Sequence, residues 1–258
     1  MIGAYREFEG CMRLAGYVLR RLPVLALPPV SEALTRQIYF TGASATAGMV
    51  LRGAFIGTLI IAYVIDVLDA NSALAVKILI WVVLREVGPL IAAVLVIQRS
   101  GTAVATELAV MQISGEVANL RHMRIDPRDY LVVPRVVGIA LSTAALTFYV
   151  QVIAVGGGML LSSLTIDASL GELTTEFFAL ASPVDFIYSV IKSLLFGAAI
   201  ALVCCYHGLH PPGMSINAVP KAAINGVTQS TLLVMLLNVV FAYLVFGQAF
   251  FGLVTAKL

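Results

Sequence analysis

The chain has 258 residues, of which 60% are hydrophobic and only 12% are charged, and its net charge at pH 7 is +2. A soluble domain would have about a quarter of its residues charged, so this composition excludes a soluble globular protein and indicates an integral membrane protein. The three cysteines, Cys11, Cys204 and Cys205, lack disulfide or metal-ligand spacing and are expected to be reduced apolar side chains. His207 and His210 lack further ligands nearby, so we predict no metal site.

Residues 5–22 have the pattern of a helix that lies on the membrane surface. Apolar residues recur at helical spacing on one face, and Arg6, Arg13 and Arg20 lie on the opposite face. These charges interrupt any apolar core, so we do not expect a cleavable signal peptide. A group of prolines then prevents the helix from continuing. We predict an interfacial helix and an elbow over residues 1–36; an amphipathic helix packed on its own protein is the alternative.

Five apolar runs follow, and each is long enough to cross a membrane, which takes about 20 residues. Their predicted bounds are 38–65, 74–97, 131–164, 186–206 and 227–254. The expected fold is therefore all-α and integral to the membrane. Lys and Arg concentrate before the first run and after the second, whereas the connection after the third run contains acidic residues and neither Lys nor Arg. This bias predicts a cytoplasmic N-terminus and a C-terminus on the other side.

Charged residues inside the first two runs are the main functional signal. Arg52 lies near the middle of the first run, Arg85 and Glu86 lie near the middle of the second, and Pro89 follows as a kink. Charges at membrane depth are costly and need a structural or functional reason. Because the two runs cross in opposite directions, Arg52 and Glu86 fall at similar depth. We expect Arg52 or Arg85 to pair with Glu86 beside a cavity; a pair that only fixes helix register is the alternative.

The connection between the second and third runs predicts a short helix across residues 115–123. Ser114 can cap this helix, and Asp126 with the proline after it ends it. Its apolar positions include Val117, Leu120 and Met123. A short helix with an apolar edge and basic residues can dock into a groove of a partner protein. A basic loop held at anionic headgroups is the alternative.

Catalytic and nucleotide-binding patterns are not found in the sequence. The histidines lie in connections or at their edges, and Ser44 is surrounded by small residues that favour helix packing. No lysine follows a glycine in the phosphate-loop pattern. We therefore expect a chain that is no enzyme and binds no cofactor, with ATP and Mg²⁺ held by another chain if transport uses ATP. We also expect no nucleic-acid partner.

Residues 84–135 contain short motifs in the order and spacing of one family. The motifs are Leu84–Pro89, Gln98–Gly101, Ala105–Leu108, Met111, Met123–Pro127 and Tyr130–Arg135. With them the chain resembles MlaE/YrbE-type permeases, the membrane subunits of lipid-transporting ABC systems associated with MCE-domain proteins. The resemblance implies a permease domain of this type over residues 37–258.

The resemblance also implies partners and a substrate. It implies a homodimer above two ABC ATPase subunits, an MCE-domain protein on the periplasmic side and, in many systems, a small STAS-domain subunit. It implies that phospholipid is moved between the bacterial inner membrane and the periplasmic MCE-domain carrier, which maintains the lipid asymmetry of the outer membrane. The direction of movement does not follow from the sequence.

Site residues are assigned from the intramembrane charges and from the resemblance together. The candidates for the lipid cavity are Arg52, Tyr63, Arg85, Glu86 and Pro89, where Tyr63 lies near a position at which the family commonly has a glutamine. By position, residues 115–124 would be the coupling helix in the groove of the ATPase. The coupling candidates are Glu107, Met111, Gly115, Glu116, Val117, Leu120, Arg121, Met123, Arg124 and Asp126. We expect one helix, from residue 88 to about 111, to link the two sites.

Two other functions stay open on the sequence. An ion- or proton-coupled secondary transporter or channel would use Arg52, Arg85 and Glu86 as its path, but it would usually show internal repeats, and the sequence shows none. A membrane scaffold would anchor soluble partners through residues 115–129. A scaffold predicts that mutations among the intramembrane charges leave function intact.

Overall fold

The computed structural model describes residues 2–42, 48, 51, 55, 58–59, 80–165 and 170–255. Within these ranges the chain is built of helices and short connections and contains no strand, which confirms the predicted all-α class. Most of the first predicted run, 38–65, lies outside the described residues, and so do Arg52 and Tyr63. The prediction of five spans is therefore tested for only four of them.

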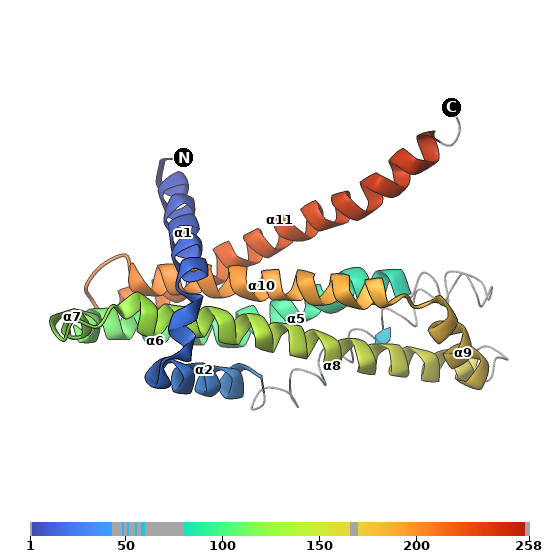
Figure 1. The fold of residues 1–258 in the computed structure, drawn as a ribbon, viewed down its shortest axis with the longest axis horizontal. Coiled ribbons are helices and arrows are strands. Elements are labelled where there is room, and N and C mark those ends of the chain that lie inside the picture. Colours follow the sequence, from blue (N-terminus) through green and yellow to red (C-terminus); the bar gives the residue numbers. More distant parts are fainter. Residues whose placement is uncertain are drawn as a thin grey trace.

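The N-terminal region consists of α1 (Ile2–Arg20), the short 3₁₀ helix η1 (Leu22–Ala26) and α2 (Pro28–Thr41). α2 begins with proline, which suits the first turn of a helix because no N–H is needed there. Figure 1 shows α1 crossing the long helices steeply, while α2 runs alongside α8. α1 buries Leu14 and Val18 on its own chain but exposes Met12 and Leu19. Its apolar face is thus shared between packing and the exterior.

One long helix runs through the stretch that carries most of the predicted motifs. It comprises η3 (Ile80–Val87, π-helical), α5 (Gly88–Val96), η4 (Ile97–Gly101, π-helical) and α6 (Thr102–Ile113). Its apolar span reaches from Val83 to Ile113. We predicted that the span ends at residue 97, but the helix continues because Val104, Ala105 and Leu108 are buried in the bundle. The predicted link from residue 88 to about 111 is confirmed.

The remaining elements follow in the order α7 (Glu116–His122), η5 (Arg128–Val132, π-helical), α8 (Val133–Thr165), α9 (Leu170–Leu180), α10 (Pro183–Leu209) and α11 (Ala218–Thr255). Four helices of the described part are long and apolar enough to cross a membrane: Val83–Ile113, Arg128–Leu160, Pro183–Leu209 and Ala218–Leu244. The last of these begins nine residues before the predicted 227. α9 was not predicted, because its sequence reads as a polar connection.

The long helices α5, α6, α8 and α10 form the bundle, and small residues let them approach closely. A Cβ added to Gly197 of α10 would lie 2.7 Å from the Cα of Ala140 on α8, and one added to Gly208 would lie 2.7 Å from the Cβ of Leu108 on α6. α11 diverges from the bundle (Figure 1). Only 11% of its apolar window is buried, against 50–56% for the other three spans, so α11 offers a largely uncovered apolar surface.

Candidate functional site

Two ion pairs join η3 to α10, and we call the four residues the ion-pair cluster. Arg85 pairs with Asp185, and Glu86 Oε2 lies 2.7 Å from Lys192 Nζ. Asp185 is 3% exposed and Lys192 is fully buried. Because 185 and 192 are seven residues apart, both partners lie on one face of α10. They belong to its N-terminal half, so the cluster lies nearer to the α9 end than the expected middle of the membrane.

Pro89 explains why two backbone carbonyls near the cluster accept hydrogen bonds from side chains of other helices. Proline has no N–H, so it cannot donate to the carbonyls four and five residues before it, which are those of Arg85 and Leu84. Side chains of other helices donate to them instead. Lys192 Nζ donates to the Arg85 carbonyl at 3.0 Å, and Gln151 Nε2 donates to the Leu84 carbonyl at 2.8 Å. These two carbonyls are therefore satisfied by α10 and α8, as an apolar environment requires.

Further polar and aromatic side chains surround the ion-pair cluster. Gln151 Nε2 also lies 2.6 Å from Ser189 Oγ, which ties α8 to α10. Lys192 Nζ lies 5.8 Å from the ring centroids of Tyr188 and Phe196 and 6.0 Å from that of Phe241, distances at which a cation is attracted to a ring. Glu86 Oε1 is buried and has no hydrogen-bond partner among the described residues. One acceptor of the cluster is thus available.

The structure corrects the predicted pairing. Arg85 pairs with Asp185 and not with Glu86, because Glu86 is turned toward Lys192. The Arg52 alternative lies outside the described residues. Sequence reasoning missed Asp185, Lys192 and Gln151 as site residues. A signal existed for two of them, since Lys192 and Gln151 are isolated polar residues within apolar runs.

The opposite end of the bundle carries α7. Gly115 precedes it in the left-handed conformation, with φ of +83°, which glycine adopts without strain. The predicted capping by Ser114 is wrong: no side chain caps α7, and the Ser114 hydroxyl lies 3.0 Å from Glu116 Oε1. Arg124, at φ +59°, ends the turn that follows.

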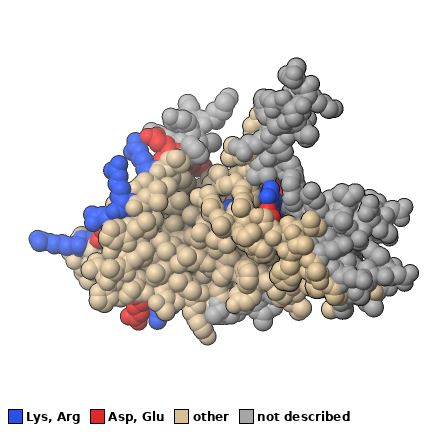
Figure 2. Space-filling model, turned by 45° about the vertical axis from the view of Figure 1, so that its right-hand side comes forward, with Lys and Arg blue, Asp and Glu red and all other residues tan. Residues whose placement is uncertain are grey.

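Burial divides the predicted docking residues. Val117 is 1% exposed and belongs to the core of its own chain, and Leu120 packs against that core, whereas Met123 is 62% exposed. The prediction that Val117 faces a partner is therefore wrong, because α7 uses its apolar edge to attach to the bundle. Its outward side consists of Glu116, Ala118, Asn119, Arg121, His122 and Met123. Figure 2 shows Lys and Arg side chains gathered around this end of the molecule.

Contacts from α1 and α8 hold this end in place. The Tyr17 hydroxyl on α1 lies 2.7 Å from Asp129 Oδ1 and 2.9 Å from Asp126 Oδ2. Burial, and then these two carboxylates, raise the pKa of Tyr17 above its ordinary value. Glu107 on α6 pairs with Arg135 on α8 at 2.9 Å.

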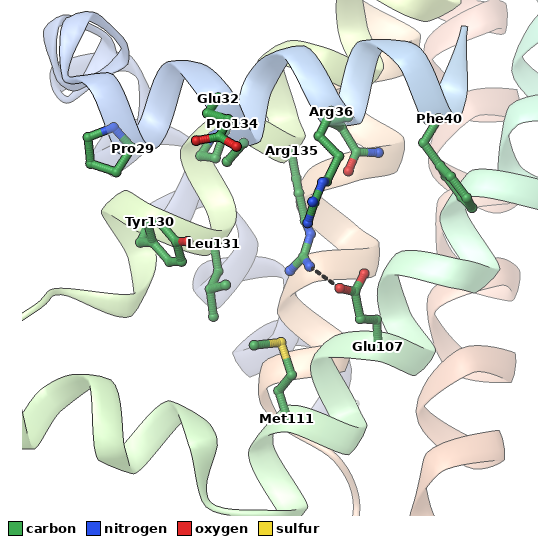
Figure 3. A pocket seen from close by; sticks show the side chains of 12 residues that line it. Pro29, Glu32, Arg36, Phe40, Glu107, Met111, Tyr130, Leu131, Pro134 and Arg135 are labelled. Carbon is green, nitrogen blue, oxygen red and sulfur yellow. Dashed lines mark ion pairs between the residues drawn. The ribbon is translucent and has the colours of Figure 1, made fainter. Parts of the chain in front are cut away.

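Some of the coupling candidates line one of two cavities at this end. A cavity of about 580 Å³ is lined by Val117, Arg121, Arg124 and Asp126, among others. A second cavity, of about 620 Å³, includes Glu107 and Met111 and lies against α2 (Figure 3).

Long apolar helices, paired charges between them and a polar basic end define a multi-pass membrane protein. The chain belongs to the MlaE permease family, whose model, described as Permease MlaE, matches residues 34–244. This membership confirms the resemblance to MlaE/YrbE-type permeases.

The chain is similar to several named proteins. A probable ABC transporter permease protein of Rickettsia prowazekii is 32% identical over 162 residues, which cover 63% of this chain and 62% of that protein. One of Synechocystis sp. is 31% identical over 167 residues, covering 63% and 61%. The Arabidopsis thaliana protein TRIGALACTOSYLDIACYLGLYCEROL 1, chloroplastic, is 30% identical over 167 residues, covering 65% and 46%. Less than two thirds of each of these relatives is matched.

Proposed function

We propose that this chain is the membrane subunit of an ATP-driven phospholipid transporter. In this proposal, phospholipid moves between the bacterial inner membrane and a periplasmic MCE-domain carrier, and the movement maintains the lipid asymmetry of the outer membrane. The observation that carries the proposal is membership in the MlaE permease family over residues 34–244. The relatives named as ABC transporter permeases support an ATPase partner, and the lipid in the name of the Arabidopsis relative supports a lipid cargo.

The α7 end is the proposed contact with the ATPase. It is basic, and short connections rich in Lys and Arg face the cytoplasm by the positive-inside rule, where an ATPase finds ATP. The outward residues of α7, Met123 above all, would enter the groove of the ATPase. The contacts of Val117 within the bundle would pass the movement of the ATPase on to α6. This assignment retains the predicted coupling segment but changes the residues that make the contact.

The ion-pair cluster is the proposed responsive element on the lipid path. The rigid helix from Gly88 to Ile113 joins it to the α7 end, and its two ion pairs connect that helix to α10. A tilt of this helix would strain or release the pair of Glu86 and Lys192, and separating them would leave the fully buried charge of Lys192 without compensation. Movement of lipid could then be linked to nucleotide events at a distance.

A homodimer fits the uncovered surface of α11. A span that faces lipid on most of its sides is stable, but a second copy can bury the same surface against itself. An MCE-domain protein on the periplasmic side and a STAS-domain subunit on the ATPase complete the proposed assembly. In it the N-terminus is cytoplasmic and the C-terminus periplasmic.

A proton-coupled transporter is the second candidate, and one observation favours it. Glu86 Oε1 is buried without a hydrogen-bond partner in the described part of the chain, and ionisable residues at membrane depth are typical of ion and proton pathways. Such a transporter would work without an ATPase.

Purification of the intact complex tests the proposal. The full chain is purified from its own host in mild detergent together with the subunits bound to it, and retained lipids are identified by mass spectrometry. We expect a co-purifying ATPase whose activity depends on this chain, and retained phospholipid above the detergent background. A chain that carries lipid in proteoliposomes under a proton gradient, with no ATPase present, would contradict the proposal and support the second candidate.

A further inference from the structure

The cavity between α2, α6 and the start of α8 has features that the transport proposal does not use. Its volume is about 620 Å³, and it is lined by both polar and apolar side chains. Figure 3 shows Glu32, Arg36 and Phe40 along the α2 side, and Arg135 reaching from α8 toward Glu107. We call it the α2 cavity.

Two arginines of the α2 cavity have guanidinium N–H groups that form no hydrogen bond with the described residues. One terminal nitrogen of Arg135 pairs with Glu107, but the other, Nη1, is buried and has no hydrogen-bond partner among the residues that the structure describes; the whole residue is only 9% exposed. A buried guanidinium nitrogen without an acceptor is unfavourable, so an oxygen-bearing ligand would stabilise it. Arg36 forms no ion pair or hydrogen bond with any other residue that the structure describes. Both arginines can therefore bind an anion.

Two carboxylates balance these charges. Glu32 lines the cavity one helical turn before Arg36, and Glu107 lies across from it on α6. The charged groups of the cavity are thus two guanidiniums and two carboxylates, with no net charge. A zwitterion matches this set better than a simple anion does, because each of its charges finds an opposite one. The apolar walls, Phe40, Met111 and Leu131, suit a ligand that is itself amphipathic.

The depth of the α2 cavity matches the headgroup boundary of a membrane. The spans of 31 and 33 residues are about 46 and 50 Å long, whereas the hydrocarbon core is about 30 Å thick. About 8–10 Å of helix therefore projects beyond the core at each end if the spans are centred. Arg135 lies seven residues after the start of its span and Glu107 six before the end of its own, which is about 9–10 Å in both cases.

We propose that the α2 cavity binds the headgroup of an aminophospholipid, such as phosphatidylethanolamine, from the leaflet at the α7 end. The phosphate would accept hydrogen bonds from Arg36 and Arg135. The primary ammonium would donate to Glu32 and Glu107, which the quaternary ammonium of phosphatidylcholine cannot do. This site is distinct from the ion-pair cluster, about 33 Å away along the helix between residues 85 and 107. It does not depend on what the permease transports, because any protein at this depth meets membrane lipid.

Photolabelling of the full chain in nanodiscs tests this site. The nanodiscs contain phosphatidylcholine and a small fraction of phosphatidylethanolamine with a photoactivatable group on its acyl chain near the glycerol, which leaves the primary ammonium free, and labelled peptides are mapped by mass spectrometry. We expect labelling of residues 29–40 and 107–111. Arg36→Gln should weaken the apparent affinity about tenfold, because a hydrogen bond to a charged group is lost. Arg20→Gln, which removes an exposed arginine of α1 instead, is the matched control and should label like the wild type.

Competition identifies the ligand. Unlabelled phosphatidylethanolamine should suppress the labelling, and phosphatidylglycerol, which has the phosphate but no amine, should suppress it less. Glu32→Gln should remove that preference. Soluble glycerophosphoethanolamine should compete only weakly. Equal labelling of Arg36→Gln and wild type would overturn the site, equal competition by phosphatidylglycerol would overturn the aminophospholipid, and full competition by the soluble headgroup would overturn the membrane as its source.

Discussion

Charged residues differ in burial between the two ends of the helix Val83–Ile113. At the α9 end, Arg85 and Glu86 each pair with a residue of α10, and Lys192 is fully buried. At the α7 end, Arg121 and Arg124 are exposed and the apolar Val117 is buried. The first end largely buries its charges, whereas the second exposes those of α7 and of the turn after it and buries Arg135, which pairs with Glu107.

This difference in burial predicts which charged residues stabilise the fold and which are available to a partner protein. Removing one member of a buried pair leaves the other charge without compensation, which destabilises the protein itself. Removing an exposed charge changes stability little, so an effect on function there reports on a partner. Five substitutions test this difference and the contacts around it.

Lys192→Met should have the largest effect. It leaves Glu86 without its cation and the Arg85 carbonyl without a donor, which we expect to cost about 3–5 kcal/mol. The midpoint of thermal unfolding in detergent measures this loss. Lys221→Met, at an exposed position near the start of α11, is the control. The exchanged pair Glu86→Lys with Lys192→Glu should recover much of the stability, and a double variant no better than the single ones would disprove the pairing.

Val117→Asp and Met123→Asp should differ although both lie in the coupling segment. Val117→Asp places a charge in the core and should cost about 3 kcal/mol of unfolding free energy. Met123→Asp should change stability by less than about 0.5 kcal/mol but reduce co-purification of the ATPase. Thermal unfolding and pull-down are measured side by side. A stable Val117→Asp variant that lacks the ATPase would show that Val117 faces the partner after all.

Gln151→Leu should cost about 2 kcal/mol, because the Leu84 carbonyl loses its donor from α8 and Ser189 loses a partner. Gln98→Leu, at an exposed position on the long helix, is the control. The cause can be isolated by adding Pro89→Ala, which restores a backbone N–H to this turn. The Gln151→Leu loss should be smaller in that background, and an equal loss would mean that Gln151 does not compensate for the proline.

Tyr17→Phe should have the smallest effect, about 1 kcal/mol or less, because its contacts with Asp126 and Asp129 lie near the surface. The folded state raises the pKa of Tyr17, so its stabilising effect is present below the ordinary pKa of about 10. The effect is lost as the pH rises from about 10 through the higher folded pKa. The difference in unfolding temperature between Tyr17→Phe and wild type should thus shrink above pH 10. A difference that stays constant would contradict the role of the hydroxyl.

Much of the fold could be predicted from hydropathy alone. The apolar runs 131–164 and 186–206 correspond to described helices, and the link from residue 88 to 111 is continuous. The lower bound of the last span was misplaced. It begins in a stretch interrupted by Pro220, Lys221 and Asn225, which is helical because Ala218, Val219 and Ala222 are buried, and a window average hides such contacts.

The site was predicted less well, for a physical reason. Periodicity tells which side of a helix is apolar but not which neighbour covers it, so Val117 was assigned to a partner rather than to its own bundle. Pairing depends on distance in space, and Asp185 looked like a residue of an external connection until the start of α10 brought it to Arg85. The pairing predicted for Arg52 stays a prediction.

Phospholipid transfer from proteoliposomes tests whether this chain is the membrane subunit of an ATP-driven lipid transporter. The complete complex is reconstituted with fluorescent phospholipid, and transfer to or from the MCE-domain carrier is followed with ATP, with a non-hydrolysable analogue and with a proton gradient alone. We expect transfer to require ATP hydrolysis and to be lost in the stably folded Met123→Asp variant. Transfer at an unchanged rate with the analogue, or driven by the proton gradient alone, would contradict it.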